Sequence, residues 1–253
     1  MNKKQNVLII GYPRSGTSLL RVILDSHPDI SIGPEIKFMQ KIIRKFPMTF
    51  NNFLEVSERE KTDYQFSIND CKNIYNKSTN WSSLLENWCD LYSSKRGKKI
   101  WGDKTPQSYK YLLPLIKAFP DAMYIYIVRN PFDVMGSMIS KGWYKRPKSI
   151  LAWCYSNFIS TRLKTKNNLF IRYEDFADNP QKHVEIILNK MNLEKIDLVS
   201  SYQDVDHGRI AVGDTWNKPI ESSDKKKKTE LLKKTDKILI GILCFYFIKK
   251  YNY

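Results

Sequence analysis

The sequence predicts an α/β fold in which a central, mostly parallel sheet is flanked by helices. Short, continuous apolar runs alternate along the chain with segments of helical periodicity, and the first run leads through a glycine-containing turn directly into a helix. Continuous apolar runs are typical of strands that are buried on both faces, and their alternation with helices favours parallel pairing through right-handed crossovers. A chain of 253 residues, 42% of them hydrophobic and 27% charged, has the composition of a globular protein.

Five apolar runs mark the expected strands, which are 7–10, 30–32, 99–102, 123–128 and 169–172. Turn residues follow several of them: Gly11 follows the first, and Asn130 and Pro131, which suit the start of a helix, follow the fourth. Helical periodicity places helices at 17–26, after Pro131, at 181–191 and over 238–248.

We expect a single domain over 1–253. Residues 36–100 are polar, aromatic-rich and mostly helical in pattern, so they form a helical insertion between two strands. Residues 206–229 change in character, because Gly, Asp, Ser and a run of four lysines replace large apolar residues. This segment is predicted to be an exposed loop that leads into the last helix.

The charge and the cysteines limit the partners. Lys and Arg number 42 and Asp and Glu 26, which gives a net charge of +16 and favours an anionic partner. The lysines are scattered and no recognised nucleic-acid motif is present, so we do not expect nucleic acid as the partner. The four cysteines lack the spacing of a zinc site, no other metal cluster is evident, and reduced thiols suit a reducing compartment.

The apolar runs are too short for a signal peptide or a membrane span. Only 7–10 follow the basic N-terminus, whereas a signal peptide needs an apolar stretch of at least ~7 residues. The longest run, 238–248, falls short of the ~20 residues that span a bilayer. We expect it to be a buried helix rather than a membrane-surface helix, and the protein to be soluble and cytoplasmic with no transmembrane segment.

The segment Gly11-Tyr-Pro-Arg-Ser-Gly-Thr-Ser18 is predicted to bind phosphate. It lies between a strand and a helix, and its glycines are separated by four residues, as in a Walker A loop. Backbone N–H groups and the helix dipole attract an anion there, and the glycines permit close approach. Thr17 replaces the Walker lysine, and the cation is Arg14 inside the loop. The other expected contacts are Ser15, Gly16 and Ser18.

Two blocks of the sequence resemble the sulfotransferases that use PAPS (3′-phosphoadenosine 5′-phosphosulfate). Residues 11–21 are similar to the family's 5′-phosphosulfate loop, and the continuation 24–35 resembles the tyrosylprotein and bacterial branch. Residues 126–137 (Tyr-Ile-Val-Arg-Asn-Pro-Phe-Asp-Val-Met-Gly-Ser) are similar to the 3′-phosphate segment, and weaker matches at 172–176 and 208–216 follow in family order. The resemblance implies a P-loop NTPase-like three-layer fold, PAPS as the donor and adenosine 3′,5′-bisphosphate (PAP) as the product.

A second anion site is predicted over 129–141. Arg129 ends a strand, and Asp133, Ser137 and Lys141 have the spacing of residues on one helix face. The structural alternative is an ion pair between Arg129 and Asp133. Two separate phosphate sites imply a ligand that carries phosphate at both ends. ATP does not, because its phosphates form a single chain. By resemblance, Arg129 and Ser137 bind the 3′-phosphate, and Lys141 occupies a position that is often basic.

The resemblance adds two further contacts. Tyr173 lies where the family often has a tyrosine near the nucleotide, although a buried tyrosine with a satisfied hydroxyl is a close alternative. Arg209 lies in the loop, 206–229, that would close over the nucleotide, where a basic residue meets the 3′-phosphate. This block departs from the family pattern at Gly208 and Thr215.

Sulfuryl transfer needs a base for the acceptor hydroxyl and cations at the leaving phosphate oxygen. Glu35 is the expected base, because it follows the second strand and aligns with the catalytic glutamate of the tyrosylprotein branch; a surface ion pair with Lys37 is the alternative. Lys104 aligns with a family lysine that stabilises the transition state, and a salt bridge to Asp103 is its alternative. Arg14 shares the leaving oxygen, so no metal is needed.

Other catalytic assignments are weaker. His27 is a rival base, but its position before Pro28 at a helix end favours a role as a C-terminal cation. His183 and His207 have no partner pattern. A P-loop small-molecule kinase would explain 11–18, yet it lacks the Walker lysine and leaves 129–137 without a role.

The acceptor is not identified by the sequence. The excess of positive charge hints at an anionic acceptor such as a bacterial glycan, and peptide tyrosine, a lipid and a small phenol remain open. The helical insertion 36–100 is expected on the acceptor side. Its aromatics are candidates for a sugar- or phenol-binding cleft, although core packing explains most such residues. Three further candidates are Trp143, Tyr144 and Trp153.

Overall fold

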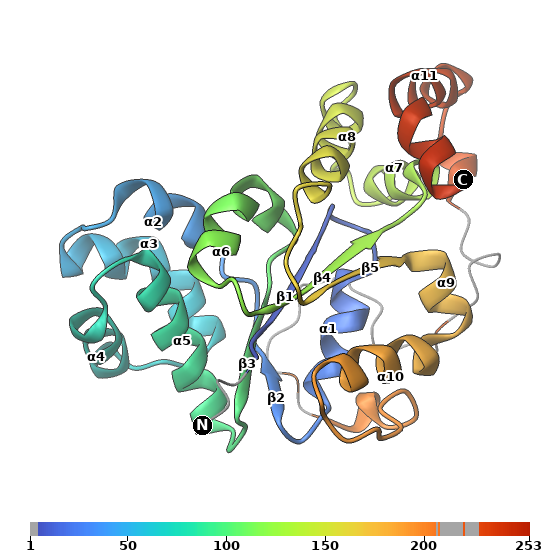
Figure 1. Cartoon of the computed structure of the whole chain (residues 1–253). Helices are drawn as coiled ribbons and strands as arrows, with labels where there is room; N and C mark the ends of the chain where they lie inside the picture. Colours follow the sequence, from blue (N-terminus) through green and yellow to red (C-terminus); the bar gives the residue numbers. More distant parts are fainter. Residues whose placement is uncertain (1–4, 206, 208–219, 221–227) are drawn as a thin grey trace.

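A computed structural model describes residues 5–205, 207, 220 and 228–253. Five strands form one parallel sheet in the order β2-β3-β1-β4-β5 (Figure 1). They are β1 (Val7–Gly11), β2 (Ile30–Ile32), β3 (Ile100–Lys104), β4 (Met123–Val128) and β5 (Asn168–Arg172). The predicted parallel α/β fold is therefore confirmed, and the strand limits differ from the expected ones by two residues at most.

The sheet is buried on both faces because the apolar residues of its strands alternate between two cores. In β1, Val7 and Ile9 belong to one core and Leu8 and Ile10 to the other, as the twofold period of a strand requires. All four side chains are at most 1% exposed. A run without polar residues thus gives a central strand that needs helices on both sides.

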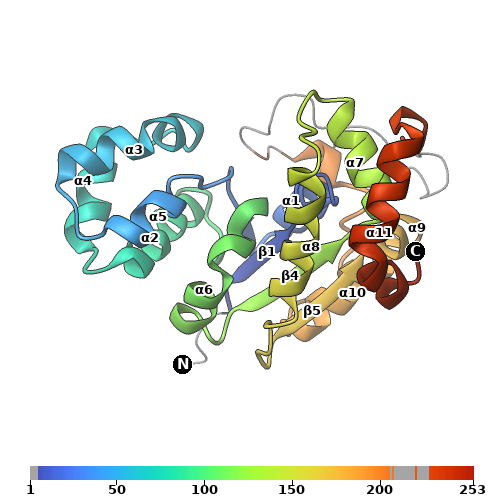
Figure 2. The same ribbon diagram turned by 90° about the horizontal axis from the view of Figure 1, so that it is seen from above.

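Helices supply the two outer layers (Figures 1 and 2). The face of Val7 and Ile9 is covered by α1 (Thr17–Asp25), α9 (Tyr173–Asp178) and α10 (Pro180–Lys190). The opposite face is covered by η1 (Pro106–Tyr111), α6 (Leu112–Ala118), α7 (Pro131–Ile139), α8 (Lys148–Ser160) and α11 (Lys234–Tyr251). Short 3₁₀ turns occur at η2 (Tyr202–Asp204) and η4 (Thr229–Leu231).

A helical lobe lies between β2 and β3 in the chain and projects to one side of the sheet (Figure 2). Its helices are α2 (Met39–Lys45), α3 (Phe50–Asp63), α4 (Ile68–Lys77) and α5 (Trp81–Lys95). Trp88 is fully buried, and its ring lies 4.9 Å from the rings of Phe38 and Phe66. Capping boxes at Ser67 and Asn80 define where α4 and α5 begin. The aromatic residues of this segment therefore serve mainly as its core.

The structure corrects the expectation of a buried C-terminal helix. The run 238–248 lies in α11, but only one stripe of that helix faces the core. The buried stripe consists of Ile240, Cys244, Phe247 and Tyr251. On the other side, Ile242 is 67% and Phe245 65% exposed. No helix among the described residues combines the length and the apolar character needed to cross a membrane. Most of the loop expected over 206–229 lies outside the described residues.

Candidate functional site

The candidate site lies at the carboxyl edge of the sheet, where ligands of open α/β folds bind. Each strand ends next to a residue that the sequence singled out. β1 leads into the loop 11–18, β2 is followed by Glu35, β3 ends at Lys104, β4 is followed by Arg129 and β5 by Tyr173. Parallel pairing therefore brings to one edge side chains that lie far apart in the sequence.

The loop after β1 has the geometry of an anion cradle. Gly16 is the N-cap of α1 with φ of 93°, and a Cβ on it would lie 2.2 Å from Cδ2 of Tyr173, so the position requires glycine. Arg14 also has a positive φ of 70°. Thr17 starts α1 and is buried. The Ser15 hydroxyl is buried and has no hydrogen-bond partner among the described residues, which fits a site completed by a ligand.

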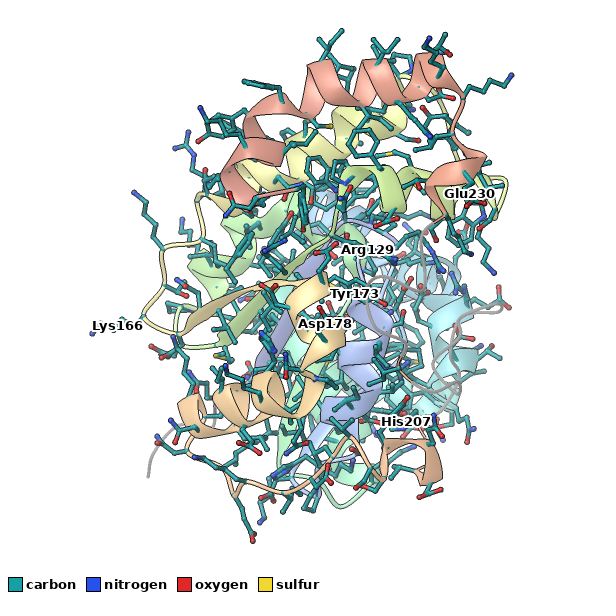
Figure 3. The ribbon with its side chains drawn as sticks, turned by 90° about the vertical axis from the view of Figure 1, so that its right-hand side faces the viewer. Arg129, Lys166, Tyr173, Asp178, His207 and Glu230 are labelled. Carbon is teal, nitrogen blue, oxygen red and sulfur yellow. The ribbon has the colours of Figure 1, made fainter. Side chains whose placement is uncertain are left out.

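Direct contacts join this loop to the second predicted anion site. Arg14 Nε donates to Ser137 Oγ at 3.1 Å, and Arg129 Nη1 donates to the carbonyl oxygen of Arg14 at 3.4 Å. The Arg129 guanidinium lies over the ring of Tyr173, with Cζ 4.2 Å from the ring centroid (Figure 3). Arg129 Nε is buried and lacks an acceptor within the described part of the chain. The residues expected at the two ends of a bisphosphate thus form one continuous cluster.

Lys104 lies between the start of α1 and Glu35. Its Nζ donates to Ser18 Oγ at 3.2 Å and to Glu35 Oε1 at 2.8 Å. The ammonium of Lys37 lies 3.3 Å from Glu35 Oε2. Burial favours a higher pKa for Glu35, but the charges of Lys104 and then Lys37 outweigh it, so the pKa of this carboxyl lies below its ordinary value. The two ion pairs therefore favour the ionised form of Glu35 and make it a weaker proton acceptor than a free glutamate.

A buried hydrogen-bond chain holds the backbone beside Glu35. Thr105 Oγ1 donates to Asp103 Oδ1 at 2.9 Å and accepts the amide N–H of Ile36, also at 2.9 Å. Burial raises the pKa of Asp103 to about 7. The sequence offered Asp103 only as a partner of Lys104, because its burial and its link to Ile36 cannot be seen in the local pattern.

Two other predictions differ from the described site, and a third falls on a residue outside it. Helix α7 ends at Ile139, so Lys141 does not continue the helix face of Ser137. His27 is buried and its Nδ1 accepts the amide N–H of Asp29 at 3.0 Å; burial lowers the pKa of His27, which contradicts the expected helix-end cation. Arg209 lies outside the described residues.

The aromatic candidates for the acceptor cleft have different environments. Trp153 is fully buried, and the Tyr144 hydroxyl donates to Asp236 Oδ1 at 3.0 Å. Trp143 is 49% exposed, and the Arg14 guanidinium carbon lies 5.9 Å from its ring centroid. Of these three, Trp143 is therefore the aromatic side chain beside the site.

A buried charge network behind the loop was not predicted. Asp25, at the end of α1, accepts hydrogen bonds from Arg96 Nη1 at 2.7 Å, from Ile32 N–H at 2.8 Å and from His207 Nδ1 at 2.8 Å. Arg21 Nη2 donates to the carbonyl oxygen of His207 at 2.6 Å. These bonds fix α1 against β2 and the end of α5. Sequence spacing gives no signal for partners that are 71 and 182 residues from Asp25.

One pocket lies apart from this cluster. A pocket of about 720 Å³ opens between the end of α9 and residues 199–203, and none of the described candidate residues lines it. In the part of the chain that the structure describes, no three His, Cys, Asp or Glu side chains come together as metal ligands.

Comparison with known proteins gives consistent results at the level of sequence and fold. A family profile described as "Sulfotransferase family" matches residues 6–197. Protein-tyrosine sulfotransferase 1 of Danio rerio is 25% identical over 222 residues, which cover 81% of this chain and 58% of that protein. The chain thus spans little more than half the length of this curated relative.

Solved structures share the fold over nearly the whole chain. The sulfotransferase domain of the Synechococcus PCC 7002 olefin synthase has a TM-score of 0.66 at 20% identity, covering 98% of this chain and 96% of that one. Mouse sulfotransferase SULT7A1, solved in complex with PAP, has a TM-score of 0.58 at 16% identity, covering 97% and 85% of the two chains. Both are similar in fold to the three-layer arrangement described above.

Proposed function

This chain belongs to the sulfotransferase family, and from that premise we propose that it transfers a sulfuryl group from PAPS to a hydroxyl acceptor. The observation that carries the proposal is the contact chain from Arg14 to Ser137 and from Arg129 to the Arg14 carbonyl. It brings two arginines and a serine together at one edge of the sheet, which supports a ligand that carries more than one phosphate group. The family match does not favour the kinase alternative.

The residues of the cluster fit a bisphosphate nucleotide. The buried Ser15 hydroxyl and Arg129 Nε lack partners among the described residues, so each has hydrogen-bonding capacity for a ligand. The N-terminus of α1, together with Ser15, Gly16, Thr17 and Ser18, would hold the 5′-phosphate end. Arg129 and Ser137 would hold the 3′-phosphate, with Tyr173 against the Arg129 guanidinium. Arg209 remains a proposed contact from outside the described residues.

Bound PAPS supplies the sulfuryl group, and PAP is the leaving group. Glu35 removes the proton of the acceptor hydroxyl as its oxygen bonds to sulfur, and the bond from sulfur to the 5′-phosphate oxygen breaks in line. Lys104 and Arg14 stabilise the negative charge that develops on that phosphate oxygen. Because Lys104 Nζ lies between Ser18 Oγ and Glu35 Oε1, one ammonium group serves both the phosphate loop and the base.

The acceptor is proposed only as a hydroxyl compound. The zebrafish relative is named for protein tyrosine, whereas the net charge of +16 favours an anionic glycan, the acceptor class put forward from the sequence. Trp143, half-exposed beside Arg14, is a surface on which a sugar or an aromatic acceptor ring would stack.

Incubation with labelled PAPS and a panel of acceptors tests the reaction. The panel contains a tyrosyl peptide, anionic glycans, a lipid with a free hydroxyl and small phenols, and mass spectrometry detects the gain of one sulfuryl group. Transfer to any of them supports the proposal. Phosphorylation of an acceptor by ATP and Mg²⁺, without sulfuryl transfer, would contradict it.

Glu35→Gln tests the base. We expect turnover to fall by about 10²-fold or more, the scale of general-base loss, while the affinity for PAP measured by calorimetry stays unchanged. Glu55→Gln, an exposed position on α3, is the matched control and should keep full turnover. Wild-type turnover in Glu35→Gln would remove this residue from the mechanism.

A further inference from the structure

Helix α11 presents an apolar stripe to solvent. Ile238, Ile242 and Phe245 follow one another at spacings of four and three residues, so they share one side of the helix, and Lys249 continues the same line. Ile238 is 54%, Ile242 67% and Phe245 65% exposed. Tyr246 beside them is equally exposed. Helix α11 is therefore apolar on its exposed side as well as on its buried side, unlike an amphipathic surface helix.

Helix α8 repeats this pattern. Leu151, Tyr155 and Phe158 have the same spacings of four and three residues, and Arg162 follows just after the end of α8 at Ser160. Each of the three apolar side chains is about half exposed. Both helices thus expose three large apolar residues at the same spacings, and a basic residue follows in the sequence.

The two helices are neighbours in the outer layer of the molecule. They lie side by side on the sheet face opposite α1 and α10 (Figures 1 and 2). Cys154 Sγ of α8 lies 3.3 Å from Cys244 Sγ of α11, and the rings of Trp153 and Phe247 pack edge to face with centroids 6.0 Å apart. We call the exposed apolar side chains named above for these two helices the outer apolar face. They are Leu151, Tyr155, Phe158, Ile238, Ile242, Phe245 and Tyr246.

Basic residues outnumber acidic ones in the two segments that carry the outer apolar face. Residues 145–166 contain six basic and no acidic residues, and residues 231–253 contain five basic residues and one acid, Asp236. Asp236 is buried and is bound by the Tyr144 hydroxyl and the Arg146 guanidinium. These two segments alone hold a net ten of the sixteen excess positive charges of the chain.

We propose that the outer apolar face docks on an anionic lipid surface. Apolar and aromatic side chains of a helix that enter the headgroup region, with Lys and Arg beside them, are how interfacial helices bind acidic membranes. A second copy of this chain is disfavoured, because a twofold contact would place the basic segments of two copies against each other. The inference is independent of the proposed reaction, since it uses none of the residues assigned to it.

Vesicle sedimentation with the full chain tests this docking. We expect binding to vesicles of phosphatidylcholine with phosphatidylglycerol, little binding to phosphatidylcholine alone, and weakening with salt. Lys249→Glu combined with Lys250→Glu should weaken binding about tenfold or more, because each basic residue near an acidic surface contributes roughly fivefold. Ile242→Ser combined with Phe245→Ser should also weaken it by about tenfold or more through the loss of buried apolar area.

Matched controls and a second readout complete the experiment. Ile68→Ser and Leu113→Ser remove equally exposed apolar residues from α4 and α6 and should leave vesicle binding unchanged. Phe245→Trp should show a blue shift of tryptophan emission with acidic vesicles. No binding by the wild-type chain, or binding unchanged in the α11 variants, would overturn the proposal. A dimer in sedimentation that Phe245→Ser dissociates, or capture of an acidic protein in place of vesicles, would assign the face to that partner.

Discussion

Two carboxyl groups near the site have opposite properties for identifiable reasons. Glu35 faces the ammonium groups of Lys104 and Lys37, and its pKa lies below the ordinary value although it is largely buried. Asp103 is more deeply buried, with the Thr105 hydroxyl as its hydrogen-bond donor, and burial raises its pKa to about 7. Glu35 is thus ionised at rest, and its two ammonium partners lower its basicity relative to a free glutamate. Asp103 suits a structural group next to it.

Asp103→Asn gives a prediction for stability as a function of pH. The raised pKa means that the folded chain binds this proton more tightly than the unfolded chain. The contribution of Asp103 to stability is therefore present at low pH and is lost as the pH rises from about 4 to about 7. Between pH 5 and pH 8 the variant should gain on the order of 2 kcal/mol in free energy of unfolding relative to the wild type, measured by urea titration. A difference that is constant with pH would contradict the assignment.

At the scale of elements, local pattern predicted strands better than the C-terminal helix. The run 123–128 is apolar throughout and forms β4 with those limits. The run 238–248 is also apolar, but a helix on the surface can bury only one side, and the layer beyond α11 contains no further element among the described residues. Composition cannot distinguish a helix covered on all sides from one with an exposed apolar stripe.

The buried carboxylate of Asp25 joins α1 to β2 and to the end of α5 through hydrogen bonds. Burial favours a higher pKa, but the hydrogen bonds from His207 and Arg96 outweigh it and hold the pKa of Asp25 far below its ordinary value. The stabilisation is thus present above pH 4 and is lost as the pH falls toward the pKa of the folded state. Asp25→Asn should cost about 3–5 kcal/mol at pH 7, because it leaves buried cations without their partner.

Urea unfolding checks this prediction for Asp25. The cost of Asp25→Asn should shrink as the pH is lowered below about 4. Asp29→Asn is the control, since Asp29 forms a partly exposed ion pair with Lys99 at 2.8 Å, and surface pairs of this kind contribute roughly 0–1 kcal/mol. Equal costs for the two variants at pH 7 would show that the network does not hold α1 to β2 and α5.

At the scale of the whole molecule, the sheet turns sequence motifs into one site. The loop 11–18, Arg129 and Tyr173 were identified from local pattern and family resemblance, because glycines, strand ends and helix starts have strong sequence signals. The contacts of Arg14 with Arg129 and with Ser137 span 115 and 123 residues and follow only from the strand order. Thr105 also links Asp103 to Ile36, which is far away in the sequence, so local pattern could not predict these hydrogen bonds.

The central claim is that one nucleotide is held by both of its phosphate-bearing ends. Calorimetry with PAP and with adenosine 5′-phosphate tests it most directly, on the wild type, on Arg129→Ala and on the exposed control Arg162→Ala. We predict that Arg129→Ala weakens PAP binding about ten- to a hundredfold, the value of hydrogen bonds to a charged group, and adenosine 5′-phosphate far less, with no change in Arg162→Ala. Equal weakening of both nucleotides by Arg129→Ala would contradict the claim.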